Sequence, residues 1–444
     1  MERSLRVARE RPASRVVHAR GEGRPTFPDE TSMPIHLKFQ PARSSVAMAG
    51  LIGLLLSPLA QADFSIAGFE LVHSVPLATD LATPDLRQPG EVWIELFDGA
   101  QSRIDIGQFY TADHPGSLMD KVLESLEAAG QRGVKIRFLL EEKGLALSDE
   151  ATLERLRRIP NLTFRALPYA RVGGGIIHAK YLVVDGRLAF MGSQNFDWRS
   201  LEHIHETGLR ISDETMVGQV QAIFDQDWKA QAALADNKAV PLPRAGKEPA
   251  RTGNYLVASP QRYNPPGVGD SQQELPRLLA EAKREVRVQL LDYAPLSSAP
   301  DNTRAYYAVI DNALRAAAAR GVSIKLMVSD WNTGMPEVAY LKSLAVLPNV
   351  QVKIVTLPQD PQGFIPYARV IHSKTMEIDG QVAWVGTSNW LGGYLDNSRN
   401  LEVVMRDSAM AERIEALHEQ LWDGPYAWPV DIVRDYPQPH PGKP

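Results

Sequence analysis

Apolar and polar positions along this chain follow two patterns, one typical of helices and one typical of strands, and the two alternate along the sequence. Segments with the period of an amphipathic helix are separated by shorter apolar segments that read as β-strands. In the first half the predicted order is helix 92–100, strand 103–110, helix 117–130, strand 134–141, helix 149–159, strand 162–167, strand 207–211 and helix 214–231. Such alternation is typical of a layered α/β domain with a parallel or mixed sheet.

The same order starts again in the second half of the chain. The predicted elements there are helix 273–283, strand 286–293, helix 302–320, strand 323–329, helix 336–345, strand 351–357, strand 401–405 and helix 408–421. Residues 235–265 are rich in Pro, Gly, Arg and Asn and lack periodicity, which predicts a linker. We therefore expect an internal duplication, with halves 63–234 and 266–444 related by a pseudo-two-fold axis.

One motif, HxKx4Dx6G(S/T)xN, occurs once in each half. Its first copy contains His178, Lys180, Asp185, Ser193 and Asn195, and its second contains His372, Lys374, Asp379, Thr387 and Asn389. In both copies an Asp-Gly pair predicts a tight turn between two strands. Residues two apart on a strand share a face, so each His and its Lys point the same way, and the Asn returns to the same end of the sheet.

These residue types suit the binding of an anion. The set combines imidazole, ammonium, hydroxyl and carboxamide groups, and it contains no cluster of carboxylates for a metal. Two copies placed face to face would surround one phosphodiester. One His would attack phosphorus and the other would protonate the leaving oxygen, while the lysines and amides neutralise the remaining oxygens.

The doubled motif resembles that of the phospholipase D superfamily. The resemblance implies two α-β-α sandwich halves with mixed sheets, a phosphohistidine intermediate, and no metal or other cofactor. It implies that His178 is the nucleophile and His372 the general acid. The second half is most similar to the eukaryotic lysosomal phospholipase-D-like 5′-exonucleases, through residues 365–370 before its His and Gly386-Thr387-Ser388-Asn389-Trp390 after it. Those proteins act on single-stranded nucleic acid and are linked to lipid transphosphatidylation.

Further residues are assigned roles around the motif. Glu206 and Glu402 follow their histidines by 28 and 30 residues, and family members carry an acid here that orients the imidazole. Asp185 and Asp379 belong to the motif, but Asp before Gly is expected to brace the turn. Arg171 and Arg369 occur in a repeated Pro-Tyr-Ala-Arg-Val sequence and are expected to add charge at the mouth, or else to pair with surface carboxylates. The aromatic residues beside the motifs are candidates for stacking bases or for the core: Tyr169, Phe196, Trp198, Tyr367 and Trp390.

The amino end has the pattern of a secretory signal peptide. A basic lead after Met33 precedes an apolar run at 46–56 and a small-x-small site at 60–62, which predicts export to the periplasm or outside the cell. An uncleaved anchor is the alternative. Without residues 1–62 the chain has 39 Lys and Arg against 48 Asp and Glu, so we expect any affinity for anions to be local to the cleft. With no Cys in the sequence, thiol catalysis and disulfides are excluded.

Three functions remain open from the sequence. The first is an exported hydrolase of single-stranded nucleic acid, the second is a phospholipase D or transphosphatidylase, and the third is a binding protein without activity. For a lipid substrate the one candidate contact is the apolar segment 391–395. The intact double motif argues against the third possibility. The sequence does not address the oligomeric state.

Overall fold

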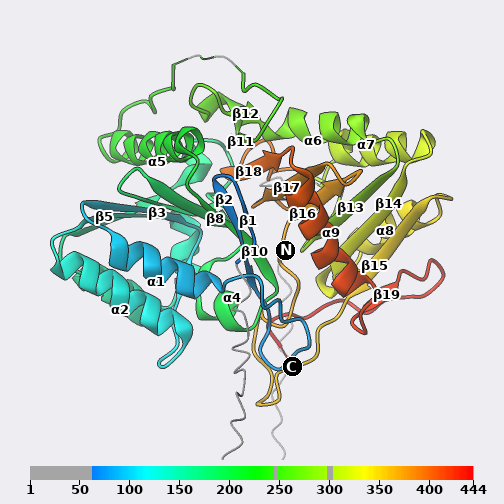
Figure 1. Ribbon diagram of the computed structural model, residues 1–444, viewed down its shortest axis with the longest axis horizontal. Helices are drawn as coiled ribbons and strands as arrows, with labels where there is room; N and C mark the ends of the chain where they lie inside the picture. The colour runs from blue at the N-terminus through cyan, green and yellow to red at the C-terminus, as the bar shows by residue number, and fades with distance from the viewer. Residues whose placement is uncertain (1–62, 245, 247, 298–303, 444) are drawn as a thin grey trace, which may run out of the picture. The chain divides into compact units, whose positions relative to one another are not determined.

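Two large mixed sheets, one from each half of the chain, form the framework that positions the motifs (Figure 1). The computed structural model describes residues 63–244, 246, 248–297 and 304–443, and the predicted signal peptide lies outside them. All described residues belong to one unit, residues 60–444. The fold class predicted from the doubled pattern, a duplicated α/β architecture with mixed sheets, is confirmed.

The first half follows the predicted order, with short additional strands. Its elements are β1 (Ser65–Ile66), β2 (Phe69–Ser74), α1 (Pro89–Gly99), β3 (Arg103–Gln108), β4 (Thr111–Ala112), α2 (Leu118–Gln131), β5 (Lys135–Glu141), α3 (Glu150–Arg158), β6 (Leu162–Leu167), β7 (Lys180–Val184), β8 (Leu188–Gly192), β9 (Phe196–Asp197), α4 (Trp198–Glu202), β10 (Glu206–Ile211) and α5 (Glu214–Ala235). The helices begin where the sequence places capping residues: the side chains of Ser117, Asp149 and Asp213 accept N–H groups of the first turns of α2, α3 and α5.

The second half repeats the arrangement. Its elements are β11 (Tyr255–Ser259), β12 (Gly269–Asp270), α6 (Ser271–Glu281), β13 (Glu285–Leu290), α7 (Ala308–Ala319), β14 (Ser323–Ser329), α8 (Glu337–Ala345), β15 (Val350–Val355), β16 (Thr375–Ile378), β17 (Val382–Gly386), β18 (Asn400–Met405), α9 (Ser408–Trp422) and β19 (Ala427–Pro429). Helix α7 begins later than predicted, because Tyr306 is held in an extended bridge with Leu296.

The strand orders of the two sheets correspond over eight positions, and the second sheet has β19 as an additional edge strand. The first sheet runs β1-β2-β10-β8-β7-β3-β5-β6, and the second runs β12-β11-β18-β17-β16-β13-β14-β15-β19. Strands β3, β5 and β6 are parallel, as are β13, β14 and β15, whereas the motif hairpins β7-β8 and β16-β17 are antiparallel. Strand β11 lies within the segment predicted as a linker and pairs with β18. It corresponds to β2, which the sequence pattern also missed.

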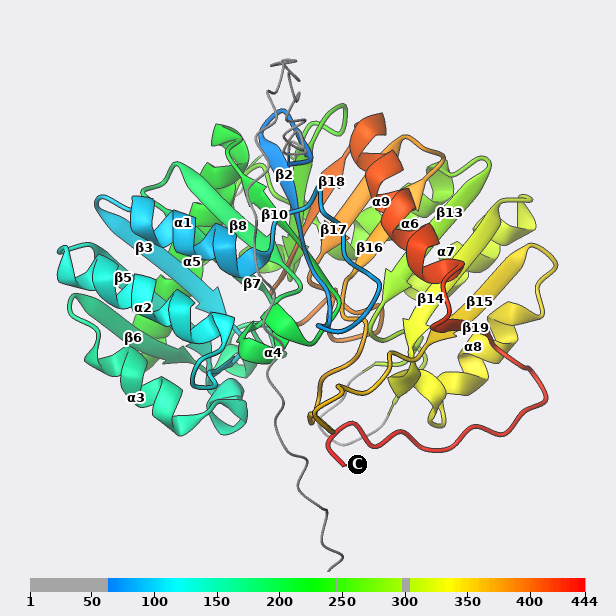
Figure 2. The same ribbon diagram turned by 60° about the horizontal axis from the view of Figure 1, so that its bottom comes forward.

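Three large hydrophobic clusters hold these layers together. In the first half, α1, α2 and α3 pack on one face of the sheet, and in the second half α6, α7 and α8 do the same (Figure 2). The remaining large cluster joins residues of α5 and α9 with strand residues from both sheets, including Leu209 and Val403. Because this cluster belongs to both halves, the halves share one core at the point where their motif strands meet.

Candidate functional site

The backbone of each motif histidine is held by the other half of the chain. The N–H of His178 donates to the carbonyl of Arg399 at 2.9 Å, and the N–H of His372 donates to the carbonyl of His205 at 2.8 Å. Arg399 and His205 are the residues just before β18 and β10. The pseudo-two-fold relation therefore brings both histidines to the wall of one cavity of about 500 Å³, as predicted, together with Asn195 and Asn389.

The Nδ1 atoms of the two imidazoles have different partners. His372 Nδ1 lies 2.7 Å from Glu206 Oε2, whereas His178 Nδ1 lies 3.1 Å from the amide oxygen Oδ1 of Asn400. Both partners come from the opposite half. Since Nδ1 of each ring is engaged, Nε2 is the nitrogen left for chemistry at phosphorus.

The prediction that Glu402 orients a histidine is wrong. Asn400 follows His372 by 28 residues, the same interval that separates Glu206 from His178, and this equal spacing was the signal in the sequence. Glu402 lies one step further along the same face of β18, where it accepts hydrogen bonds from the hydroxyls of Ser271 and Ser388. Burial raises its pKa to about 7.

The motif lysines are buried beside the histidines. Each ammonium donates to the carbonyl oxygen of the histidine two residues before it, Lys180 to His178 and Lys374 to His372. Burial lowers the pKa of Lys180 well below its ordinary value. It lowers the pKa of Lys374 to about 7, against the opposing pull of Glu206 and Asp292. A nearby anion would favour the charged form of both groups.

The two motif asparagines face the cavity. The Oδ1 atoms of Asn195 and Asn389 are buried, and neither has a hydrogen-bond partner among the described residues. The Nδ2 atom of Asn389 donates to Asp292 Oδ2 at 3.2 Å. Buried polar atoms are usually paired, so each amide oxygen has capacity to accept a hydrogen bond from a bound group, and the Nδ2 groups are the donors that an anion would need.

Ser193 and Thr387, predicted to contact substrate, lie one layer behind the cavity. The Thr387 hydroxyl donates to Asn400 Oδ1 at 2.8 Å and accepts the N–H of Leu401 at 3.1 Å. The Ser193 hydroxyl accepts the N–H of Thr207 at 3.1 Å. Both side chains are buried and absent from the cavity wall. They fix the start of β18 and β10, which carry the partners of the histidines.

The motif aspartates brace the hairpins, as the turn signal predicts. Asp185 accepts the backbone N–H groups of Gln101, Ser102 and Arg103 at 2.8 Å each. Asp379 accepts those of Lys283, Arg284 and Glu285 in the same way. Both residues have positive φ, 53° and 56°, which Asp tolerates in a tight turn better than most residues. Neither lines the cavity.

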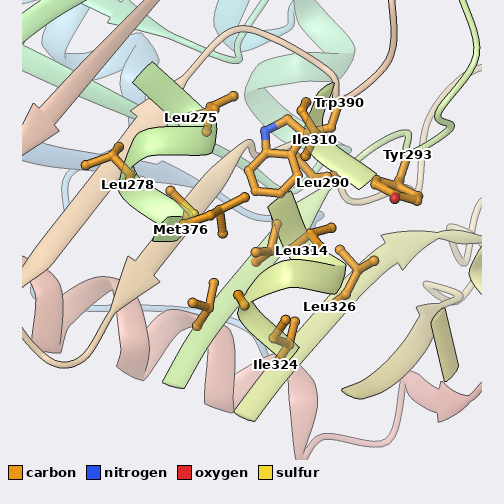
Figure 3. Packing of buried hydrophobic residues seen from close by; sticks show 14 of the residues in the cluster. Leu275, Leu278, Leu290, Tyr293, Ile310, Leu314, Ile324, Leu326, Met376 and Trp390 are labelled. Carbon is orange, nitrogen blue, oxygen red and sulfur yellow. The ribbon is translucent and has the colours of Figure 1, made fainter. Parts of the chain in front are cut away.

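Three further predicted contacts lie elsewhere. Arg171 is exposed and does not line the cavity. Arg369 is 3% exposed, and its guanidinium donates to the carbonyls of Pro358 and Leu77. Trp390 is 1% exposed and packs among Leu290, Ile310 and Tyr293 (Figure 3). Trp390 is therefore a core residue, as are Tyr169 and Phe196.

Other aromatic side chains take the place of those predicted to stack. The cavity wall contains Phe109, Tyr110, Trp331, Tyr367 and Tyr394. Of these, the stacking prediction named only Tyr367. Tyr394 presents its ring edge-on to His178, with ring centroids 4.7 Å apart. It belongs to the segment considered as a lipid contact, in which Leu395 is fully buried.

Two unlike residues occupy corresponding positions at the cavity. Tyr110 and Asp292 each follow the first residue of their strand, Arg103 of β3 and Glu285 of β13, by seven positions. Functional groups gather beyond the carboxyl ends of such parallel strands, which was the signal for both. Asp292 lines the wall, and burial raises its pKa to about 6.

Two further observations concern the described part of the chain. Within it, no group of three or more His, Cys, Asp or Glu side chains is placed to hold a metal ion. No helix among these residues is long and apolar enough to cross a membrane.

Comparison with known proteins yields matches in both halves. The family model described as "Cardiolipin synthase, PLD-like domain" matches residues 93–228 and again residues 277–422. Phospholipase D Z of Dictyostelium discoideum is 29% identical over 391 residues, which cover 81% of this chain and 90% of that protein. The 5'-3' exonuclease PLD3 of Xenopus laevis is 31% identical over 401 residues, covering 80% of this chain and 78% of that protein.

A solved structure shares the fold. The crystal structure of phosphatidylserine synthase from Haemophilus influenzae aligns with a TM-score of 0.54 and 13% sequence identity. The alignment covers 77% of this chain and 85% of that one.

Proposed function

From the premise that this chain belongs to the phospholipase D superfamily of phosphodiesterases, we propose that it hydrolyses single-stranded nucleic acid through a covalent intermediate on His178. One observation carries the proposal: two histidines from different halves line one cavity, and their Nδ1 atoms bind different partners. An amide supports a neutral ring, and a carboxylate supports a protonated one. The two histidines are thereby assigned different roles.

His178 is the nucleophile in this scheme. Burial and the neighbouring lysines lower its pKa well below 6.5, which keeps the ring neutral near pH 7. Asn400 Oδ1 accepts the Nδ1 proton, so the lone pair is on Nε2. Nε2 forms a bond to phosphorus as the bond from phosphorus to the leaving oxygen breaks. The positive charge that develops on the ring is spread over the Nδ1–H that Asn400 holds.

His372 is the general acid and then the general base. Burial lowers its pKa to about 4, and the Glu206 carboxylate opposes this shift. Burial favours the neutral acid of Glu206, but His372 and Lys374 outweigh it and lower the pKa of Glu206, so this carboxylate stays charged. A bound phosphodiester adds negative charge beside the ring, and this charge acts with Glu206 to raise the pKa of His372 from its low value. His372 then protonates the leaving oxygen and later takes a proton from the water that cleaves the P–N bond.

The lysines and asparagines hold the equatorial oxygens of the phosphoryl group. Lys180 and Lys374 supply positive charge, while Asn195 and Asn389 supply amide hydrogen bonds from the wall. Because these four side chains are buried, their interactions act at a lower dielectric than that of water and are stronger there. The chemistry requires none of the carboxylate clusters that bind divalent cations.

The aromatic side chains on the wall of the cavity favour nucleic acid over phospholipid as the substrate. Bases stack on aromatic rings with about 1–3 kcal/mol each, and five such side chains line the cavity. Relatives named 5'-3' exonuclease PLD3 support this choice. Relatives named phospholipase D keep a phospholipid substrate as the second candidate, which is favoured by the half-exposed Leu147 on the cavity wall.

Export is proposed from the pattern at 33–62. It is tested by determining the amino-terminal sequence of the protein that is recovered outside the cytoplasm.

The decisive experiment uses the purified protein with chelator and no added metal. It is incubated separately with a 5′-hydroxyl oligonucleotide and with phosphatidylcholine vesicles, and the products are resolved by chromatography. We expect nucleotides from the first and no choline from the second, and His178→Ala and His372→Ala are the inactive controls. Release of choline without release of nucleotides would show that the substrate is a phospholipid. A wild type that binds the oligonucleotide but cleaves neither substrate would favour a binding protein.

A further inference from the structure

A second cavity, of about 510 Å³, lies next to the catalytic one. It is formed by the carboxyl-terminal segment of the described chain, the segment 356–369 and the short 3-10 helix Asp330–Thr333. Its wall combines aromatic and cationic side chains: Trp331, Trp428, Tyr436, Arg369, Arg434 and Lys443. None of the catalytic residues proposed above lines it.

The two cavities share an aromatic residue of their walls. Trp331 lines both of them. Tyr367 lines the catalytic cavity and packs edge-on against Trp331, with ring centroids 6.4 Å apart. Its N–H donates to the carbonyl of Pro441, a residue of the second cavity, at 2.8 Å. The two cavities are therefore neighbours, with Trp331 in the walls of both.

The wall of the second cavity carries excess positive charge. Arg369, Arg434 and Lys443 face one lining carboxylate, Asp330, whose pKa burial raises to about 6. Asp360 lies 3.6 Å from Nη1 of Arg369 and offsets part of its charge. Nη2 of Arg369 is buried and has no hydrogen-bond partner among the described residues. In a chain of net negative charge, this is a local site that favours an anion.

The aromatic part of the wall is built as a stack. The rings of Trp428 and Tyr436 lie 5.7 Å apart with planes 23° from parallel. The Arg434 guanidinium lies over both rings, 5.8 Å and 5.2 Å from their centroids. Aromatic and guanidinium planes beside positive charge are the combination with which proteins bind single strands. Acyl chains would instead require an uncharged apolar wall.

We propose that the second cavity binds the continuation of a single-stranded nucleic acid whose scissile phosphodiester occupies the catalytic cavity. The inference rests on the proposed function and extends it, because it assigns a site for nucleotides away from the cleaved bond. Bases stack on Trp331, Trp428 and Tyr436, and phosphates pair with Arg434 and Lys443. Long strands are therefore bound more tightly than dinucleotides.

The test compares a thymidine dinucleotide with a single-stranded oligothymidylate of about twelve residues, using the full chain. The double variant Arg434→Gln, Lys443→Gln removes two exposed charges. Its matched control is Lys121→Gln, Arg187→Gln, which neutralises two exposed residues of the first half outside both cavities. In the double variant Arg434→Gln, Lys443→Gln, which we call the tail variant, we expect the KM for the long strand to rise about tenfold. The slope of log affinity against log salt concentration should become smaller in magnitude by about 1.4. The control variant and every kcat/KM for the dinucleotide should be unchanged.

The outcomes separate the two proposals. If the wild type cleaves both substrates and the tail variant handles the long strand as the wild type does, the second cavity is not a strand site and the proposed function stands. Equal losses on the dinucleotide and the long strand would also overturn the inference. If the wild type cleaves neither, the proposed function fails, and this inference fails with it.

Discussion

Glu206 and His372 belong to different halves of the chain, yet Oε2 of one lies 2.7 Å from Nδ1 of the other. The corresponding pair, Asn400 and His178, has an amide oxygen at 3.1 Å in place of the carboxylate. The pseudo-two-fold arrangement is thus symmetric in backbone and asymmetric in charge. The carboxylate favours a proton on the ring of His372, and the amide gives no such support to the ring of His178.

Replacing Glu206 by Gln should impair protonation of the leaving group. The carboxylate raises the pKa of His372 against burial, so its loss reduces the protonated fraction of the ring. We expect kcat for an oligonucleotide to fall by about 100-fold or more, within the range attributed to general acids. A p-nitrophenyl phosphodiester, whose leaving group needs no proton, should lose much less. Steady-state kinetics with both substrates measure the difference, and equal losses on both would contradict the assignment.

The order of the two histidines predicts where a covalent adduct accumulates. In His372→Ala, an activated phosphodiester should still phosphorylate His178, but the base that prepares water for the second step is missing. The adduct therefore persists and can be located by peptide mapping. His178→Ala should give no adduct. An adduct found on His372 in His178→Ala would show that His372 is the nucleophile.

Asn400 offers a way to move the pH profile. Asn400→Asp places a carboxylate on His178 Nδ1, and an opposite charge at this distance raises a pKa by about 1–3 units. Since His178 must be neutral to attack, the acid limb of kcat/KM should shift to higher pH. Glu402→Gln is the control, because Glu402 contacts Ser271 and Ser388 and no histidine. An equal shift in both variants would show that the effect is not local to His178.

The sequence predicted what depends on local pattern and missed what depends on cross-half contacts. The hairpins follow from Asp-Gly at fixed positions, and the duplication follows from two motifs with equal spacing. Strands β2 and β11 carry little alternation, since all their residues are buried between layers. Whether Trp390 would face the core or the cavity depends on which layer covers it.

The same limit applies to the orienting acid. Glu402 is a carboxylate, but the position equivalent to Glu206 is that of Asn400. In a duplicated fold the spacing is the stronger guide, because the two halves place equivalent positions alike even where the side chains differ.

Asp185, which braces the first hairpin, should contribute to stability, and its replacement should leave catalysis nearly unchanged. Asp185→Ala removes the acceptor for three backbone N–H groups and leaves Ala at positive φ, so we expect a loss of about 1–3 kcal/mol in the free energy of unfolding. Asp185→Asn, which tolerates this backbone and keeps one acceptor, should lose less. Denaturant unfolding measures both, and kcat should stay within about twofold of the wild type.

This stabilisation should depend on pH. Burial raises the pKa of Asp185, but the Ser102 hydroxyl and the N–H donors outweigh it, and the net pKa is lowered. The charged form therefore stabilises the folded state above the unfolded pKa of about 3.9, and this contribution is lost as the pH falls through the folded value. The difference between wild type and Asp185→Ala should be full at neutral pH and shrink in acid. A constant difference at all pH values would assign the effect to the turn geometry alone.

Affinity for anions should weaken above neutral pH through Lys374. Burial lowers the pKa of this ammonium to about 7, so it is charged below that pH and loses its charge above it. Sulfate, which does not titrate in this range, should inhibit competitively with an inhibition constant that rises by up to about tenfold per pH unit above 7. Asp292 raises this pKa, so Asp292→Asn should lower the pH at which the inhibition constant begins to rise, which is the break in the pH profile. Lys374→Met should abolish this break. A break that persists in Lys374→Met would assign the titration to another group.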